Sequence, residues 1–175
     1  MKKIKTTIPS QLDENQVGFL VEMINAVYKK TEGNIWKTEH VRITQPRLLA
    51  IIEKKELLLA LAGEEICGCI HLEPMSQTSY KFKMLVANPI FKGKGVGSAL
   101  VAFAEREAKK EGAKLMQLEL LVPTDFKHID KVFLNNWYTR IGYQKTGVFD
   151  VEYLDPGLSK LLKTDCIAQV YQKTL

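Results

Sequence analysis

Glycine at alternate positions marks the stretch of this chain whose residue types most clearly indicate chemistry. The glycines are Gly93, Gly95 and Gly97, and Lys92 and Lys94 alternate with them. Because glycine has no Cβ atom, such a turn can adopt left-handed backbone conformations, and its N–H groups can point at one spot. The two lysines add full positive charges beside those dipoles. The turn therefore predicts a binding site for a phosphate or a pyrophosphate.

The residues on either side of the turn predict the elements that hold it. An apolar run at 80–87 predicts a strand, and Pro89 ends it because proline has a fixed backbone angle and no N–H for the sheet. A helical pattern begins at Val96 and meets a stop signal at Gly112. The first N–H groups of a helix lack partners within it and carry partial positive charge. Strand, turn and helix N-terminus together favour an anion.

The spacing of the glycines distinguishes between three phosphate motifs. No window fits the P-loop pattern Gly-x-x-x-x-Gly-Lys-Ser/Thr. The dinucleotide pattern Gly-x-Gly-x-x-Gly matches Gly93 and Gly95, but its third position is Ser98, and the chain predicts only one strand–helix–strand unit. The coenzyme A motif Gln/Arg-x-x-Gly-x-Gly/Ala matches the segment 92–97, with lysine replacing the usual Gln or Arg.

With these residues the chain resembles the GNAT N-acetyltransferase superfamily. The segment 86–100 is similar to the family's fourth strand, turn and third helix, and 137–143 resembles its Tyr-x-x-x-Gly-Phe/Tyr motif. The resemblance covers essentially the whole chain and implies a single domain, 1–175. It implies an α/β fold of the α+β type, in which a mixed, twisted sheet of about seven strands is flanked by about four helices.

Hydrophobic periodicity predicts a matching order of elements. The predicted elements are a strand at 4–8, a helix that starts with Ser10 and Asp13 and ends in Lys29 and Lys30, a helix from Thr44 to Ile52, strands at 57–62, 66–72 and 80–87, a helix that begins at Val96, a strand at 115–122, a helix at 131–141, and strands at 147–153 and 166–172.

The resemblance implies acetyl-CoA as the cosubstrate. Main-chain groups of Leu85 and Val86 would bind the pantetheine arm between splayed strands 4 and 5, and backbone N–H groups of the turn would bind the pyrophosphate. The implied cofactor-binding residues are Leu85, Val86, Lys92, Gly93, Lys94, Gly95, Val96, Gly97 and Ser98.

The resemblance also implies a mechanism in which an amine attacks the thioester directly, without a Cys or Ser nucleophile. Tyr138 matches the family tyrosine that protonates the departing thiolate; ordinary packing of an aromatic side chain is the alternative. Glu73, at the end of the third strand, is the candidate base. His71 and Glu119 compete with it, and ordered water is a further alternative.

The acceptor pocket of this family lies largely between its first two helices. Here that region offers Tyr28, Trp36 and Glu39, with Glu32 and His40 nearby. Aromatic and acidic groups suit a cationic amine. The expected activity is transfer of an acetyl group to a primary amine of a small-molecule or amino-acid-like acceptor. The alternatives are a protein N-terminal or lysine acetyltransferase and a non-catalytic acyl-CoA-binding sensor domain.

Cys67, Cys69 and His71 alternate along a predicted strand, so we expect them to face the same side. Adjacent ligands on one strand, without a fourth partner, do not match the common zinc spacings. We therefore predict buried cysteines and no metal.

Composition bounds the remaining properties. The three cysteines fit a reducing compartment, and the lack of a signal-peptide pattern makes the cytoplasm the expected location. No apolar run is long enough for a membrane span. The net charge is +5, and the sequence contains no block of like charges, so a nucleic-acid partner is not expected. The oligomeric state stays open, with a homodimer as one option.

Overall fold

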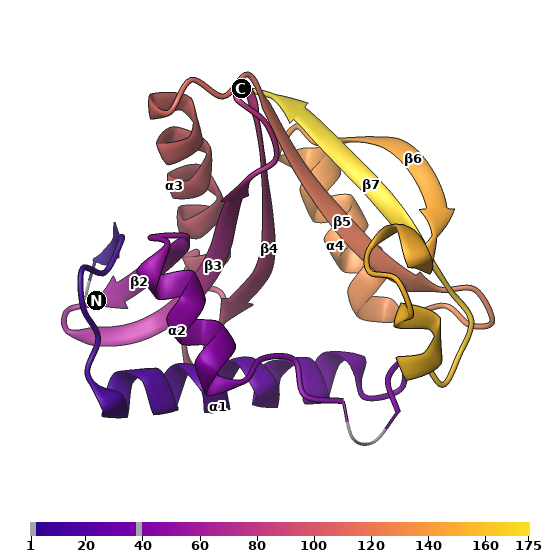
Figure 1. The fold of residues 1–175 in the computed structure, drawn as a ribbon, viewed down its shortest axis with the longest axis horizontal. Coiled ribbons are helices and arrows are strands. Elements are labelled where there is room, and N and C mark those ends of the chain that lie inside the picture. The colour runs from indigo at the N-terminus through magenta and orange to yellow at the C-terminus, as the bar shows by residue number, and fades with distance from the viewer. Residues whose placement is uncertain (1–2, 38–39) are drawn as a thin grey trace.

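A computed structural model describes residues 3–37 and 40–175 of the protein. Seven strands and four α-helices make up this part of the chain, which confirms the predicted fold class (Figure 1). The elements are β1 (Ile4–Thr7), α1 (Glu14–Glu32), α2 (Gln45–Glu53), β2 (Leu57–Ala62), β3 (Glu65–Pro74), β4 (Ser79–Ala87), α3 (Val96–Lys110), β5 (Leu115–Pro123), α4 (Ile129–Arg140), β6 (Gln144–Asp150) and β7 (Cys166–Thr174), with short 3₁₀ turns at Pro89–Phe91, Val151–Tyr153 and Leu158–Leu161.

The strands form one sheet in the order β1-β2-β3-β4-β5-β7-β6. Its neighbouring strands are antiparallel except β4 and β5, which are parallel and are joined by the crossover helix α3. Within the described chain, these two strands pair only where Ser79–Lys81 meets Leu115–Gln117. Beyond that point they separate, and Figure 1 shows the gap widening toward α1. The sheet is thus opened along its middle.

Helices cover both faces of the sheet. One core lies under α1 and α2 and contains Leu20, Ile24 and Leu48 with Leu57 and Leu59 of β2. The opposite core lies under α3 and α4, and its members come from both helices and from five strands. These members include Leu58, Ile70, Phe82, Leu100, Ala104, Met116, Tyr138 and Tyr171. No helix among the described residues is long and apolar enough to cross a membrane.

The start of α1 differs from the prediction by one turn. Asp13, not Ser10, caps the helix: its side chain accepts the Gln16 N–H at 2.8 Å, and the Gln16 side chain accepts the Asp13 N–H at 3.1 Å. This reciprocal pair is a capping box with glutamine at its third helical position. The start of α2 was predicted correctly, with Thr44 as its N-cap and Pro46 in the first turn.

The prediction that Cys67 and Cys69 face the same side is wrong. A β-bulge lies at Cys67: Ala60 of β2 pairs with Gly68, whereas the next residue, Leu61, pairs with Ile66. The extra residue reverses the alternation of side chains. Cys67 therefore packs in the core under α3, and Cys69 packs in the core under α1. Both are fully buried with free thiols, as predicted.

The predicted strand at 147–153 is displaced. β6 runs from Gln144 to Asp150, and the chain then turns at Val151–Tyr153. The Asp150 side chain accepts the Glu152 N–H at 2.9 Å, and this local bond ends the extended backbone.

Candidate active site

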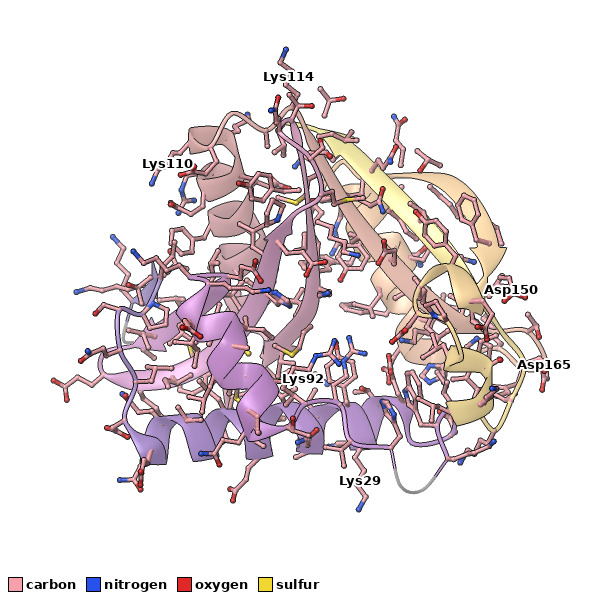
Figure 2. All side chains as sticks on the ribbon, in the orientation of Figure 1. Lys29, Lys92, Lys110, Lys114, Asp150 and Asp165 are labelled. Atoms are coloured by element: carbon pink, nitrogen blue, oxygen red, sulfur yellow. The ribbon has the colours of Figure 1, made fainter. Side chains whose placement is uncertain are left out.

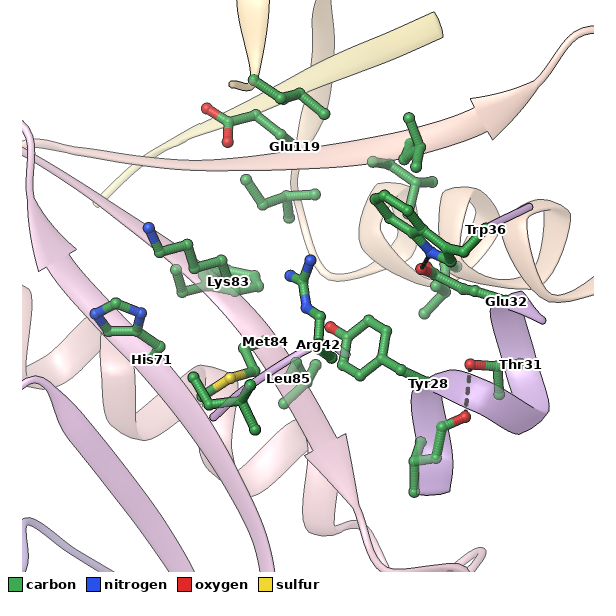
Figure 3. Close-up of a pocket in the computed structure, with 18 of the residues that line it drawn as sticks. Tyr28, Thr31, Glu32, Trp36, Arg42, His71, Lys83, Met84, Leu85 and Glu119 are labelled. Atoms are coloured by element: carbon green, nitrogen blue, oxygen red, sulfur yellow. Dashed lines mark hydrogen bonds between the residues drawn. The ribbon is translucent and has the colours of Figure 1, made fainter. Parts of the chain in front are cut away.

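A cavity of about 640 Å³ lies where β4 and β5 separate. Its walls come from α1, the segment that follows α1, α2, strands β3 to β5, α4 and the 3₁₀ turn at Leu158–Leu161 (Figure 3). This volume is within the range of about 300–1,000 Å³ found for small-molecule sites.

A second bulge shapes the β4 wall of this cavity. Lys83 and Val86 of β4 pair with His71 and Cys69 of β3, so β4 holds one residue more than β3 over this stretch. Met84 takes up the extra residue with a positive φ of 54°. Within the described chain, no residue of β4 beyond Lys81 pairs with β5, so main-chain groups on that side face a gap.

The two β4 residues predicted to hold the pantetheine arm lie at this bulge. Leu85 lines the cavity. The Val86 side chain is 1% exposed and packs in the core under α1, which leaves only its main chain for a ligand.

The glycine turn follows β4 and ends at the start of α3. Gly93 and Gly95 have φ of 76° and 78°, and Gly95 is the N-cap residue of the helix. A Cβ atom at either position would meet nothing within 4 Å. Glycine is therefore favoured at both positions because of the backbone conformation, and not because a side chain would be crowded.

Most amides of the turn are available to an anion. The Lys94 N–H donates to the Phe91 carbonyl at 3.1 Å and is thus occupied. The amides of Gly93, Gly95, Val96, Gly97 and Ser98 make no hydrogen bond to another described residue. They lie at the positive end of the α3 dipole, so the arrangement suits a phosphate group.

The lysines of the turn are exposed, and Figure 2 places Lys92 in the half of the molecule where β4 and β5 have separated. Trp137 of α4 covers the other side of the turn. Its ring lies 3.6 Å from the position that a Cβ atom on Gly97 would take. This contact brings the helix that carries Tyr138 against the first turn of α3.

Tyr138 lines the cavity and is 5% exposed. Its ring packs among Phe82, Trp137, Tyr143 and Tyr171, with centroid distances of 5.0–6.3 Å. Burial raises the pKa of its phenol above the ordinary value. The hydroxyl makes no hydrogen bond to any residue in 3–37 or 40–175. A neutral phenol that keeps its proton and has no protein acceptor can donate to a ligand.

Glu73, the predicted base, does not line the cavity. Its carboxylate is held by two lysines of β4, with Lys83 Nζ at 2.8 Å and Lys81 Nζ at 3.3 Å. Burial raises the pKa of this carboxyl, but the two ammonium groups outweigh that effect and hold the pKa below its usual value. These ion pairs make Glu73 a weak proton acceptor.

The two competing bases, His71 and Glu119, do line the cavity. The His71 Nε2 atom lies 2.9 Å from Glu56 Oε2. Burial is the main cause that lowers the pKa of His71, and the nearby Lys83 charge adds to it. His71 is therefore neutral at pH 7. With Nε2–H donating to Glu56, its Nδ1 atom keeps a free lone pair.

Glu56, His71 and Glu73 bring three ligand atoms within 4.8 Å of one another. The two lysines already neutralise Glu73, and a cation bound there would displace Lys83 from 2.8 Å. We interpret the group as an ion-pair network.

The residues predicted for the acceptor have different environments. Tyr28 and Trp36 both line the cavity. Glu32 does too, but its carboxylate is buried against Lys131 and also accepts the Trp36 Nε1–H at 2.8 Å. Burial raises the pKa of Glu32, and Lys131 more than reverses that shift, so the carboxyl is ionised and paired. It is not free for an ammonium group. The predicted Glu39 lies outside the described residues.

The sequence-based reasoning did not assign a role to two cations of the cavity wall. Lys131 is 5% exposed and lies 99 residues from its partner Glu32, so no local pattern indicates the pair. Arg42 follows α1, and its Cζ atom lies 4.5 Å from the centroid of the Tyr28 ring. Figure 3 shows its guanidinium directed into the cavity beside that ring.

Comparison with known proteins agrees with this architecture. A family model described as "Acetyltransferase (GNAT) domain" matches residues 53–145. An aminoalkylphosphonate N-acetyltransferase from Salmonella typhimurium is 32% identical over 93 residues, which cover 50% of this chain and 56% of the relative. The chain thus matches about half the length of that curated relative.

Solved structures share the fold over nearly the whole chain. The PaiA N-acetyltransferase from Thermoplasma acidophilum, solved with coenzyme A, covers 99% of this chain and 99% of its own, with a TM-score of 0.73 and 18% identity. An aminoglycoside 6'-N-acetyltransferase, also solved with coenzyme A, covers 97% and 96%, with a TM-score of 0.73 and 16% identity. At these identities the likeness shows the fold alone.

The family model describes an acetyltransferase (GNAT) domain, and the solved structures share the fold of this chain. Because the family model spans more than half of the chain, the chain belongs to the acetyltransferase (GNAT) domain family. The sequence-based predictions of the family and the fold are thereby confirmed.

Proposed function

We propose that this protein transfers the acetyl group of acetyl-CoA directly to the primary amine of a small molecule bound in the cavity. The observation that carries the proposal is the separation of β4 and β5: Leu85 of β4 lines the cavity that contains Tyr138, and the glycine turn follows at the end of the same strand. An anion site and a cavity that are both reached from β4 suit a long phosphorylated donor and a small acceptor.

The donor would be held mainly by main chain. Unpaired groups of β4 at Leu85 and Val86 would bind the pantetheine amides, in the manner of an added strand. The free amides between Gly93 and Ser98 would bind the pyrophosphate. Lys92 and Lys94 would contribute charge, which is more sensitive to salt than the backbone donors are. Bound acetyl-CoA supplies the thioester carbonyl as the electrophile.

Tyr138 is the acid of the proposed reaction. The amine nitrogen forms a bond to the thioester carbon as the carbon–sulfur bond breaks, and the departing thiolate takes the phenolic proton. Two features of Tyr138 support this role, namely its raised pKa and its hydroxyl without a protein partner among the described residues. The tyrosine recovers its proton from solvent through the open cavity.

The proton of the attacking amine must go to a base, and the geometry favours His71 over Glu73. His71 lines the cavity, is neutral, and is oriented by Glu56. Glu73 lies behind two lysines. His71 would therefore accept the proton at Nδ1, directly or through water, while Glu73 positions Lys81 and Lys83.

A small-molecule acceptor is supported by the cavity and by the names of two similar proteins. The Salmonella relative is named for aminoalkylphosphonates and the aminoglycoside enzyme for an aminoglycoside, and both are small molecules with amines. An extended groove for a peptide would be expected of a protein acetyltransferase, whereas about 640 Å³ fits a compact acceptor.

Ligand-dependent melting tests the donor part of the proposal. Coenzyme A should raise the melting temperature, because it binds only the folded state. NAD serves as the control, since it carries a pyrophosphate but no pantetheine arm. Equal shifts with both ligands would reduce the site to a general pyrophosphate site and contradict the proposal.

A further inference from the structure

The fold anchors the backbone beside Arg42 and places its guanidinium over an aromatic ring. The next residue, Ile43, is 2% exposed, and its N–H and carbonyl both bond to the side chain of Asn25 in α1, at 3.1 and 2.9 Å. The guanidinium lies over the Tyr28 ring at 4.5 Å. An anchored backbone and an aromatic surface limit the conformations of a side chain that is otherwise flexible.

The lysines of the cavity wall already have carboxylate partners. Lys131 pairs with Glu32, and both Lys81 and Lys83 pair with Glu73. Arg42 differs, because no carboxylate in residues 3–37 or 40–175 forms an ion pair with it. It is half-buried and keeps a full positive charge that faces the cavity.

Arg47 of α2 also lines this wall, but it is exposed to solvent, so Arg42 is the less exposed of the two arginines. The carboxylates of the wall that lack a lysine partner within the described chain, Asp130 and Asp155, are exposed to solvent. Water screens them more strongly than it screens Arg42. The interior of the cavity thus favours an anion, and its aromatic surface at Tyr28 is already occupied by a cation.

We infer that the acceptor amine carries an anionic group, a carboxylate or a phosphonate, which binds to Arg42. This inference rests on the proposed function and names the substrate class of that site. Arginine presents a planar fork of donors that matches two oxygen atoms of such a group. The same charge repels polycationic amines. An ω-amino acid or an aminoalkylphosphonate has the required chemistry, because one end binds the fork and the other end supplies the nucleophile.

Matched acceptors test the inference. Thiol release from acetyl-CoA is measured with β-alanine and with 2-aminoethylphosphonate as the two anionic arms. β-Alaninamide is the neutral match and spermidine the polycation. The wild-type protein should give a kcat/KM at least about tenfold higher for an anionic acceptor than for the amide, since a charge-assisted contact is worth about 1.5–3 kcal/mol and 1.4 kcal/mol is tenfold.

Substitutions assign this preference to one residue. Arg42→Met should raise KM for the anionic acceptors and so lower their kcat/KM by about 10- to 100-fold. The kcat/KM for β-alaninamide and the KM of acetyl-CoA should stay unchanged. Arg42→Lys should recover part of the loss, because lysine keeps the charge without the fork. The control is Arg106→Met, since Arg106 also lies over an aromatic ring, Phe103 at 5.4 Å, but outside the cavity.

Three outcomes separate the two proposals. Turnover that prefers spermidine, or an equal loss with anionic and neutral acceptors in Arg42→Met, overturns the inference and leaves the proposed function standing. Calorimetry with 2-aminoethylphosphonate and the coenzyme A-loaded protein gives a readout without turnover. Binding that requires Arg42 in a protein that acetylates no amine would support the anion subsite and overturn the proposed function. If the protein neither binds 2-aminoethylphosphonate nor acetylates any amine, the anion subsite and the proposed function are both overturned.

Discussion

Replacement of Tyr138 by phenylalanine separates a chemical role from a packing role. The hydroxyl is the only group removed, and it makes no hydrogen bond to the described residues, so the fold loses little. A general acid contributes about 100- to 10,000-fold to rate. We therefore expect Tyr138→Phe to lower kcat by about 100-fold or more, which equals about 2.7 kcal/mol in the barrier.

Tyr143 provides the matched control for this experiment. It is fully buried, its ring lies 6.1 Å from that of Tyr138, and its hydroxyl donates to Glu105 Oε1 at 2.9 Å. Tyr143→Phe should lower the free energy of unfolding by about 1.5–3 kcal/mol, because it removes a bond to a charged group. It should leave kcat unchanged. The two variants thus have opposite effects on stability and on catalysis.

The assay combines urea denaturation with steady-state thiol release over pH. Because burial raises the pKa of Tyr138, its acid form persists at every pH up to its ordinary value near 10, and kcat should not fall there through loss of its proton. The KM of acetyl-CoA should stay close to wild type in both variants. An unchanged kcat in Tyr138→Phe, or an equal loss in both variants, would refute the assignment of Tyr138 as the acid.

Three further predictions concern the surroundings of the site. Gly95→Ala should lower the free energy of unfolding by about 1–2 kcal/mol and weaken coenzyme A binding, because φ is 78° there, although a Cβ atom has room. An unchanged midpoint of urea denaturation would contradict this. Lys131→Met should lower the free energy of unfolding by about 3–5 kcal/mol, because it leaves the Glu32 carboxylate buried without its partner. Adding Glu32→Gln should restore part of this stability in urea denaturation, and an equal loss of stability in the double variant would exclude this cause. The pKa of His71 is lowered from its ordinary value of 6.5, so its neutral form predominates above that pH, and the acidic limb of kcat/KM that comes from protonation of His71 should lie below it; His71→Gln should abolish this limb, and its persistence would exclude His71 as the base.

The donor side of the site could be predicted from sequence because its signals are local. Gly93 to Gly97 determine the turn through their own backbone preferences, and the helix after the turn follows from its periodicity. Tyr138 was singled out by the short motif at 137–143, whose Gly142 has a φ of 99° and directly follows the C-cap residue of α4. Each of these features depends on neighbours within a few residues.

The acceptor side depends on contacts between distant residues, and there the prediction was incomplete. Glu32 suggested an acidic group for an amine, but Lys131 pairs with it from 99 positions away. Glu73 suggested a base at a strand end. Its register partner across the β3–β4 hairpin is Lys81, and Lys83 stands two residues farther along the same face. The alternation of those lysines was a signal that, combined with the hairpin, could have indicated the ion pairs.

Bulges account for a further difference between the predicted and the observed sheet. An alternating pattern assigns Cys67 and Cys69 to one face, and a single extra residue in the strand reverses one of them. The bulge at Met84 has no glycine to mark it, since a methionine takes the positive φ of 54°. Such positions are set by packing of the whole sheet and leave little trace in composition.

Product analysis by mass spectrometry tests the central claim most directly. The protein is incubated with acetyl-CoA and one primary amine, and free coenzyme A and the acetylated amine are both quantified. Direct transfer predicts that the two products form in equal amounts, with the acetyl group on nitrogen, and that Tyr138→Phe slows both to the same extent. Release of coenzyme A without acetylated amine, or firm binding of acetyl-CoA without either product across a panel of anionic amines, would contradict the account.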